Sequence, residues 1–104
     1  MNNQEQKGIF DLGFVNRINH LSTELPITNR EKEILTEIAQ GKTNRQISQK
    51  LILSPSTVRN HISSIFNKLR ISNRSQATAI AIYSGLLTLE NFSDQALSQA
   101  SDSK

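Results

Sequence analysis

Apolar residues recur at helical spacing along most of this chain, and the first such stripe lies near the N-terminus. Its members are separated by three or four positions: Phe10, Phe14, Ile18, Leu21 and Leu25. Because an α-helix has about 3.6 residues per turn, this spacing puts these side chains on one face. The pattern predicts an amphipathic helix over 8–23, ended by Pro26, whose ring cannot continue a helix.

Four more short helices are expected between Thr28 and Leu86, because similar capping chemistry marks each start. A Ser or Thr followed three residues later by Glu or Gln forms a capping box, which satisfies two backbone N–H groups at the helix start. Thr28 with Glu31 marks the first start, and Thr43 with Gln46 marks the second. The remaining signals are Gly41 at the end of the first helix, Ser54 and Pro55 at the start of the third, Asn73 and Gln76 at the start of the fourth, and Gly85 at its end.

The third of these helices has two contrasting faces when its residues are projected at about 100° per residue. The apolar arc consists of Val58, Ile62, Ile65, Phe66 and Leu69. The opposite arc consists of Asn60, Ser63, Ser64 and Asn67, with Arg59 and Arg70 at its margin. Arg, Asn and Ser pair with base edges, and this face has no carboxylate to repel phosphate. Only the short turn 52–54 precedes the helix, as in a helix-turn-helix, whose second helix enters the major groove of DNA.

The charge distribution is more informative than the net charge, which is only +3. The segment 38–89, called the basic segment below, contains seven Lys and Arg residues and no acidic residue. Unopposed positive charge is expected of a chain that binds a polyanion such as DNA. A merely solvated basic surface would have the same composition, so charge alone leaves both interpretations open.

Three gapped runs of residues have fixed spacings along the chain. They are Thr28-x-Arg30-Glu31-x-Glu33-Ile34-Leu35 continued by Gly41-Lys42-Thr43-Asn44-x-x-Ile47, then Leu51-x-x-Ser54-x-x-Thr57-Val58-Arg59-x-His61-x-x-x-Ile65-x-x-Lys68-Leu69, then Arg74-x-x-Ala77-x-x-x-Ala81. Together they resemble the LuxR/FixJ/GerE-type helix-turn-helix of transcriptional regulators, over residues 28–86. Two positions depart mildly from that pattern, Ser48 where Ala is usual and Ile71 where Val is common, and both keep the approximate size of the side chain.

The resemblance implies an all-α fold: a four-helix LuxR-type helix-turn-helix domain, here with an extra N-terminal amphipathic helix. It implies that the third helix, 55–70, lies in the major groove and that the fourth helix pairs two subunits. Carried over position by position, it makes Arg59, Asn60 and Ser63 base-reading residues, and Thr57 and Lys68 phosphate contacts. Charge and placement at helix ends add three further phosphate contacts: Lys42, Asn44 and Arg74.

The fourth helix is apolar on two sides. One side consists of the small or apolar residues Ala77, Ile80, Ala81 and Ser84, and the other of Ala79, Ile82, Tyr83 and Leu86. A helix that is apolar all round in a small domain needs a second cover. The resemblance implies that the cover over the second side is the same helix of another subunit, which predicts a homodimer. The competing cover is the chain's own helix 8–23. In a dimer, that helix would either extend the interface or pack onto its own domain.

The residues give no sign of catalysis or of a bound cofactor. The chain has no Cys, and neither His20 nor His61 belongs to a Ser/His/Asp pattern or has a metal-ligand spacing. His61 is expected to pack at the edge of the core, and Glu31 is accounted for as a cap. Glu33 and Glu37, at i and i+4, are expected on a solvated face. We therefore expect a protein that is not an enzyme and needs no cofactor or metal.

These features divide the chain into an N-terminal helix and linker (1–27), the helix-turn-helix domain (28–86) and a polar, mostly disordered tail (87–104). No apolar run is long enough to span a membrane and no secretory signal is present, so a cytoplasmic location is expected. The predicted function is sequence-specific binding of double-stranded DNA by a homodimeric transcriptional regulator. The alternative is a helix-turn-helix module that binds a partner regulator or RNA polymerase. A metabolite-binding domain is a third possibility, for which no group of residues provides support.

Overall fold

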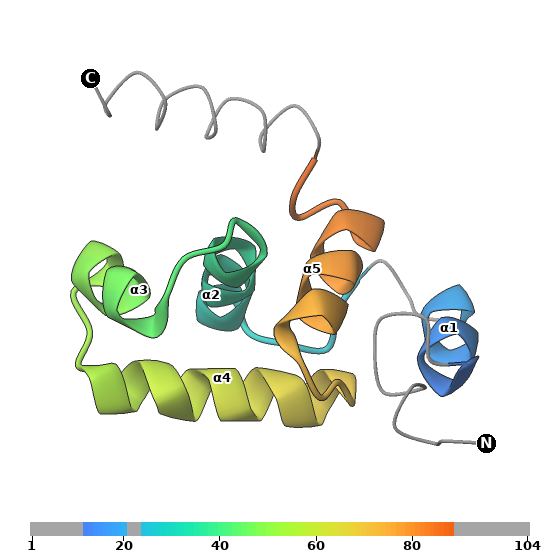
Figure 1. Cartoon of the computed structure of the whole chain (residues 1–104), viewed down its shortest axis with the longest axis horizontal. Coiled ribbons are helices and arrows are strands. Elements are labelled where there is room, and N and C mark those ends of the chain that lie inside the picture. Colours follow the sequence, from blue (N-terminus) through green and yellow to red (C-terminus); the bar gives the residue numbers. More distant parts are fainter. Residues whose placement is uncertain (1–11, 21–23, 89–104) are drawn as a thin grey trace.

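The computed structural model describes residues 12–20 and 24–88, and there the chain folds into helices joined by short loops, with no strand (Figure 1). The helices are α1 (Leu12–Asn19), α2 (Asn29–Ala39), α3 (Asn44–Leu51), α4 (Pro55–Leu69) and α5 (Arg74–Tyr83). The predicted all-α fold is confirmed. None of these helices is long and apolar enough to cross a membrane.

The predicted capping residues form the starts of α2 to α5. Thr28 Oγ1 accepts from the N–H of Glu31 at 3.1 Å, and Glu31 Oε1 accepts from the N–H of Thr28 at 2.9 Å. Thr43 and Gln46 repeat the arrangement at 3.1 and 2.8 Å. The side chains of Ser54 and Asn73 each accept from the N–H three residues later. Local sequence therefore sets where each of these helices begins, since each cap satisfies N–H groups that have no partner inside the helix.

Residues with a left-handed backbone conformation follow the helices of the domain, and only some of them are glycine. Gly41 and Gly85 have φ of +87° and +84°, as their positions predicted. After α3 and α4 the same role falls to Ile52 and Arg70, with φ of 55° and 57°. The N–H that follows each of these two residues bonds back to the last turn of the helix, which ends α3 and α4 sharply. The turn 52–54 was predicted, but the left-handed conformation of Ile52 was not, because a β-branched residue rarely adopts a positive φ.

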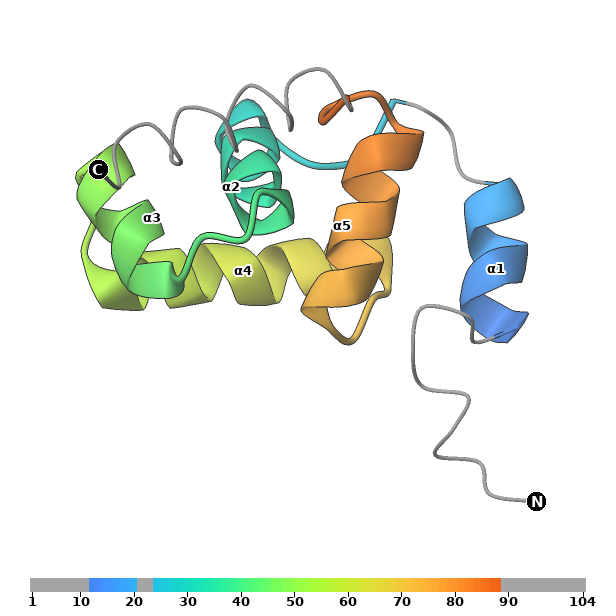
Figure 2. The same cartoon turned by 45° about the horizontal axis from the view of Figure 1, so that its top comes forward.

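α2 lies at the centre of the domain and contacts α3, α4 and α5. Figures 1 and 2 show α4 along one side, with α2, α3 and α5 on its other side. The core between them includes the fully buried side chains Ile34, Leu35, Ile47, Val58 and Ile65. This arrangement covers one face of α4 and leaves the opposite face uncovered.

The N-terminal helix packs on its own domain, beside α5 (Figures 1 and 2). Phe14 is only 3% exposed and belongs to the core, against which Ile18 also packs. The guanidinium of Arg17 donates to the backbone carbonyl of Arg70 at 2.6 Å. The packing of α1 beside α5 is one of the two covers that the sequence left open for the apolar side of α5. The rest of the predicted helix 8–23, including Phe10 and Leu21, lies outside the described residues.

The C-terminal end of the described chain still belongs to the core. Leu87, the first residue of the expected tail, is 2% exposed, and its N–H donates to the carbonyl of Ala81 at 3.1 Å. The remainder of the expected tail, from residue 89, lies outside the described residues.

Candidate nucleic-acid interface

The uncovered face of α4 contains the three predicted base-reading residues. Arg59, Asn60 and Ser63 are all exposed, whereas Val58 and Ile65, on the opposite side of the helix, are completely buried. The separation of the two faces is therefore as predicted, with Ile62 and Phe66 half-buried at the edge of the core. One expected member of the polar face, Ser64, does not belong to it, because its hydroxyl points to α2, as described below.

The first turn of α4 is tightly held by its own residues. Ser54 Oγ accepts from the N–H of Thr57 at 3.1 Å and donates to Thr57 Oγ1 at 2.8 Å. Pro55 occupies the first helical position, where its missing N–H costs nothing. Thr57, a predicted phosphate contact, is therefore fixed at the positive end of the helix dipole, where an anion is favoured.

The structure brings together three of the five predicted phosphate contacts. The guanidinium of Arg74, at the start of α5, donates to Asn44 Oδ1 at 3.2 Å and to the backbone carbonyl of Lys42. These acceptors are neutral, so the positive charge of Arg74 stays uncompensated. The sequence placed each of the three residues at a helix end but gave no sign that they are neighbours, since about 30 residues separate Arg74 from Asn44.

Glu37 of α2 is the centre of an ion cluster that the sequence did not predict. Glu37 is 8% exposed, and its two carboxylate oxygens accept from Lys42 Nζ at 2.8 Å and from Lys50 Nζ at 2.9 Å. Burial alone would raise the pKa of Glu37, but the hydrogen bonds from both lysines outweigh it and lower the pKa below 4.5. The expectation that Glu37 lies on a solvated face is wrong. Glu37 follows Ile34 by three residues and so faces the apolar side of α2.

Glu31 is the centre of a second cluster, on the same helix. It is 4% exposed, and besides the cap at Thr28 it accepts from Ser64 Oγ at 2.8 Å and from Lys68 Nζ at 2.9 and 3.2 Å. Burial alone would raise the pKa of Glu31, but these hydrogen bonds and the charge of Lys68 lower it from 4.5 to about 2. The predicted cap is thus confirmed, and the same carboxylate also fastens the C-terminal half of α4 to the start of α2.

Glu33 on α2 and Glu24 in the segment before α2 also form ion pairs, but these pairs are exposed, unlike those of Glu31 and Glu37. Glu33 is 58% exposed and pairs with Arg30 at 3.4 Å, as a solvated face predicts. Glu24 is 84% exposed and pairs with Lys32 at 3.0 Å. Such pairs contribute little to stability, because water screens them.

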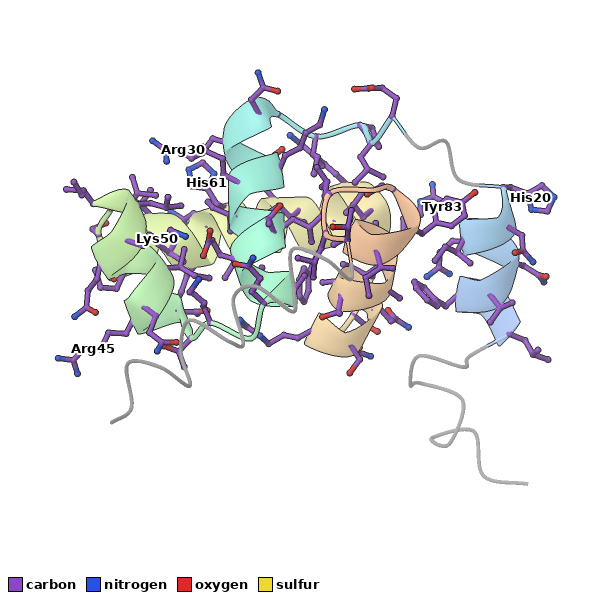
Figure 3. All side chains as sticks on the ribbon, turned by 90° about the horizontal axis from the view of Figure 1, so that it is seen from above. His20, Arg30, Arg45, Lys50, His61 and Tyr83 are labelled. Carbon is purple, nitrogen blue, oxygen red and sulfur yellow. The ribbon has the colours of Figure 1, made fainter. Side chains whose placement is uncertain are left out.

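The predicted dimer face of α5 divides into an exposed and a covered half. Ile82 is 47% exposed and Tyr83 is 42% exposed, whereas Ala79 and Leu86 are partly buried and pack against the core. Figure 3 shows Tyr83 between α5 and α1. The chain's own helices therefore leave Ile82 and Tyr83 the more exposed half of this face.

The histidines lie apart from one another. His61, half-buried on α4, is at the edge of the core, where a packing role was expected. His20 is exposed at the end of α1, with Nδ1 2.8 Å from the carbonyl oxygen of Asn16 (Figure 3). The described part of the chain holds no group of three or more His, Cys, Asp or Glu arranged to bind a metal ion.

Comparison with known proteins agrees with the resemblance that the sequence shows over residues 28–86. Residues 25–81 match the model of a family described as bacterial regulatory proteins, luxR family. Three similar proteins come from Bacillus subtilis (strain 168). The uncharacterized transcriptional regulatory protein YvfU is 49% identical over 63 residues, covering 61% of this chain and 32% of YvfU. YhcZ, of the same description, is 45% identical over 56 residues, covering 54% of this chain and 26% of YhcZ. The spore germination protein GerE is 41% identical over 63 residues, covering 61% of this chain and 85% of GerE.

The match to the larger regulators is therefore partial. The chain corresponds to 26% of YhcZ and 32% of YvfU, but to 85% of GerE. The family match, residues 25–81, covers α2 to α4 and most of α5, and so includes the uncovered face of α4 and the clusters around Glu31 and Glu37.

Proposed function

Because the chain belongs to the luxR family of bacterial regulatory proteins, we propose that it regulates transcription by binding specific DNA sequences with α4 in the major groove. Members of this family are DNA-binding regulators and not enzymes, so the protein is not an enzyme. The observation that carries the proposal is the outward face of α4, which offers arginine and uncharged hydrogen-bonding groups but no acid. Its setting is a basic segment without a single carboxylate.

The base-reading roles follow from side-chain chemistry. An arginine at the exposed position 59 can donate two hydrogen bonds to guanine, and Asn60 can pair with adenine through its amide. Ser63, one turn further along α4, can donate to or accept from either base type. Arg59 and Asn60 lie in the N-terminal half of α4 and Ser63 lies just past its middle, as expected if the N-terminal end of the helix enters the groove.

Phosphate contacts position the domain on the duplex without reading its sequence. We assign this role to Asn44 and Arg74, which lie together, and to Thr57 at the start of α4. Lys42 and Lys68 were also predicted as phosphate contacts by their position, but the ammonium group of each lies in an ion pair with α2, so we do not assign this role to them. The consequence of these ion pairs is developed in the next subsection.

Two copies of the chain are proposed to associate through the side of α5 formed by Ala79, Ile82, Tyr83 and Leu86. The exposure of Ile82 and Tyr83 supports this, because large apolar side chains on a small domain are favourable to cover. A symmetric pair would present two α4 helices to half-sites about 34–36 Å apart along the duplex. Such a regulator would act in the cytoplasm, where the DNA is.

The second candidate function is a module that binds a partner regulator or RNA polymerase. The observation that favours it is Ile52, an isoleucine 89% exposed in the turn between α3 and α4. An isolated apolar side chain of this kind is suited to a pocket on another protein. This function predicts that Ile52→Asn removes binding to polymerase and leaves DNA binding intact.

The DNA-binding function is tested with a duplex obtained by in vitro selection from random fragments. Fluorescence anisotropy titrations on that duplex and its single-base-pair variants would compare the wild-type chain with Arg59→Ala. We expect replacement of one guanine in the duplex to cost the wild-type chain about 1–3 kcal/mol of binding free energy. Arg59→Ala should abolish this discrimination. The matched control is Asn16→Ala, a truncation on the exposed surface of α1, which should keep the wild-type profile. An Arg59→Ala profile identical to that of the wild-type chain would contradict the proposed docking.

A further inference from the structure

Two carboxylates of α2 hold every lysine of the basic segment. Lys42 and Lys50 pair with Glu37 at 2.8 and 2.9 Å, and Lys68 pairs with Glu31 at 2.9 Å. Figure 3 shows Lys50 reaching from α3 towards α2. The three lysines come from the loop before α3, from α3 and from α4.

The arginines of the same segment behave differently. Within the described part of the chain, none of the four pairs with a carboxylate: Arg45, Arg59, Arg70 and Arg74. Arg45 points away from the other helices (Figure 3), and Arg74 bonds only to neutral oxygens. The basic segment therefore contains two kinds of cation, lysines with compensated charge and arginines with uncompensated charge.

The lysines cannot leave their partners without consequence. Glu31 and Glu37 are 4% and 8% exposed, and a buried carboxylate that loses its cation is strongly destabilising. The side chain of Lys42 is itself only 16% exposed. Moving Lys68 to a phosphate would leave the buried Glu31 without a cation, and moving Lys42 or Lys50 would remove one of the two cations that hold the buried Glu37. The intramolecular pairs are therefore favoured.

We propose that Glu31 and Glu37 are positioning residues that withhold the three lysines from DNA, so that within the basic segment the arginines alone supply the electrostatic attraction between DNA and the domain. This inference rests on the DNA-binding function proposed above and deepens it. Attraction to phosphate is independent of sequence and dominates binding to non-target DNA. Compensating the lysines therefore weakens binding to non-target DNA, while the arginines, whose planar fork suits phosphate and guanine, keep the contacts that depend on geometry.

The test is the salt dependence of binding to a duplex of about 25 base pairs with random sequence, labelled with fluorescein. Each phosphate neutralised contributes about −0.9 to the slope of log K against log salt. Glu37→Gln releases Lys42 and Lys50, so its slope should be steeper than that of the wild-type chain by about 1 to 2. At about 0.1 M salt, one added phosphate contact corresponds to roughly tenfold tighter binding to this random duplex.

The matched control is Glu33→Gln, which removes the same charge from the same helix. Glu33 is 58% exposed and holds Arg30 rather than a lysine of the basic segment, so the slope should remain that of the wild-type chain. The double variant Glu37→Gln/Lys50→Gln should recover part of the wild-type slope. If the role of Glu37 were purely structural, Glu37→Gln would lower the melting temperature and leave the slope of log K against log salt unchanged.

Two further variants decide the question even if Glu37→Gln fails to fold. Lys50→Gln leaves Glu37 paired with Lys42 and should not change the wild-type slope, whereas Arg45→Gln should reduce it by about 0.9. The inference would be overturned if Glu37→Gln and Glu33→Gln gave the same slope, or if Lys50→Gln reduced the wild-type slope. Either result would leave the proposed DNA-binding function standing. A wild-type chain that does not bind duplex even at low salt would overturn the proposed function as well.

Discussion

Replacing Glu31 with glutamine keeps the size of a buried side chain but removes its charge, and the structure predicts how stability should then depend on pH. Glu31 has a pKa lowered from 4.5 to about 2, because Thr28, Lys68 and Ser64 all donate to its carboxylate. A group with a lowered pKa in the folded state stabilises the fold above its unfolded pKa and loses that contribution as the pH falls. The relevant window therefore runs from about pH 4.5 down to about pH 2.

The magnitude follows from the shift in pKa. A difference of about 2.5 units corresponds to roughly 3 kcal/mol of stability at neutral pH, since one unit is worth about 1.4 kcal/mol. Linkage between protonation and folding removes about 2 kcal/mol of this by pH 3. The side chain of the partner Lys68 is 41% exposed, so water screens part of this interaction and these figures are upper limits. Glu37 also has a lowered pKa, and it loses the same contribution in the wild-type chain and in the variant.

The assay is urea unfolding followed by circular dichroism at pH 6 and at pH 3. Between these values the wild-type chain should lose about 2 kcal/mol more of its unfolding free energy than Glu31→Gln. Glu33→Gln is the control, because Glu33 is on the same helix but 58% exposed, and it should retain the wild-type loss. The reasoning is refuted if Glu31→Gln loses as much stability as the wild-type chain over this range.

Three other substitutions test the helix ends, the docking of α1 and the dimer face. Ile52→Gly should raise the unfolding free energy by about 1 kcal/mol, because glycine adopts a φ of 55° without strain and the isoleucine, 89% exposed, has little packing to lose; a loss of stability in urea unfolding would contradict this. Phe14→Ala should cost about 3 kcal/mol in the same assay because Phe14 is 3% exposed, whereas Leu12→Ala, at 71% exposure, should stay within about 0.5 kcal/mol; equal effects would mean that α1 does not dock as described. Ile82→Glu should convert the proposed dimer to a monomer in size-exclusion chromatography with light scattering, whereas Ile52→Glu should not; a dimer that survives Ile82→Glu excludes this face of α5.

Local chemistry made much of the domain predictable from its sequence. Thr28 with Glu31 and Thr43 with Gln46 specify helix starts within four residues of chain, and both capping boxes are present in the structure. The two faces of α4 could likewise be predicted, because helical periodicity alone separates Val58 and Ile65 from Asn60.

The ion clusters could not be predicted, because two of the three lysines in them are distant in sequence from their carboxylate partners. Thirteen residues separate Glu37 from Lys50, and 37 residues separate Glu31 from Lys68. The sequence showed Glu37 beside Ile34 on α2, but nothing local indicated which cations would lie there. Their pairing depends on how α2 packs against α3 and α4, which is a property of the tertiary structure.

The left-handed conformations of Ile52 and Arg70 were not predicted, for a different reason. At Gly41 the residue type itself indicates a positive φ, whereas Ile52 and Arg70 adopt one against their intrinsic preference. The position of α1 also depends on tertiary packing, since the stripe containing Phe14 fitted equally well against another molecule or against its own domain.

Chemical-shift mapping by NMR, with isotope-labelled protein and the selected duplex, tests most directly whether the outward face of α4 binds DNA bases. The account predicts that addition of the duplex shifts the signals of Arg59, Asn60 and Ser63 most strongly, together with those of Asn44 and Arg74. Unchanged signals along α4, with the largest shifts on α1 or α5 instead, would contradict it.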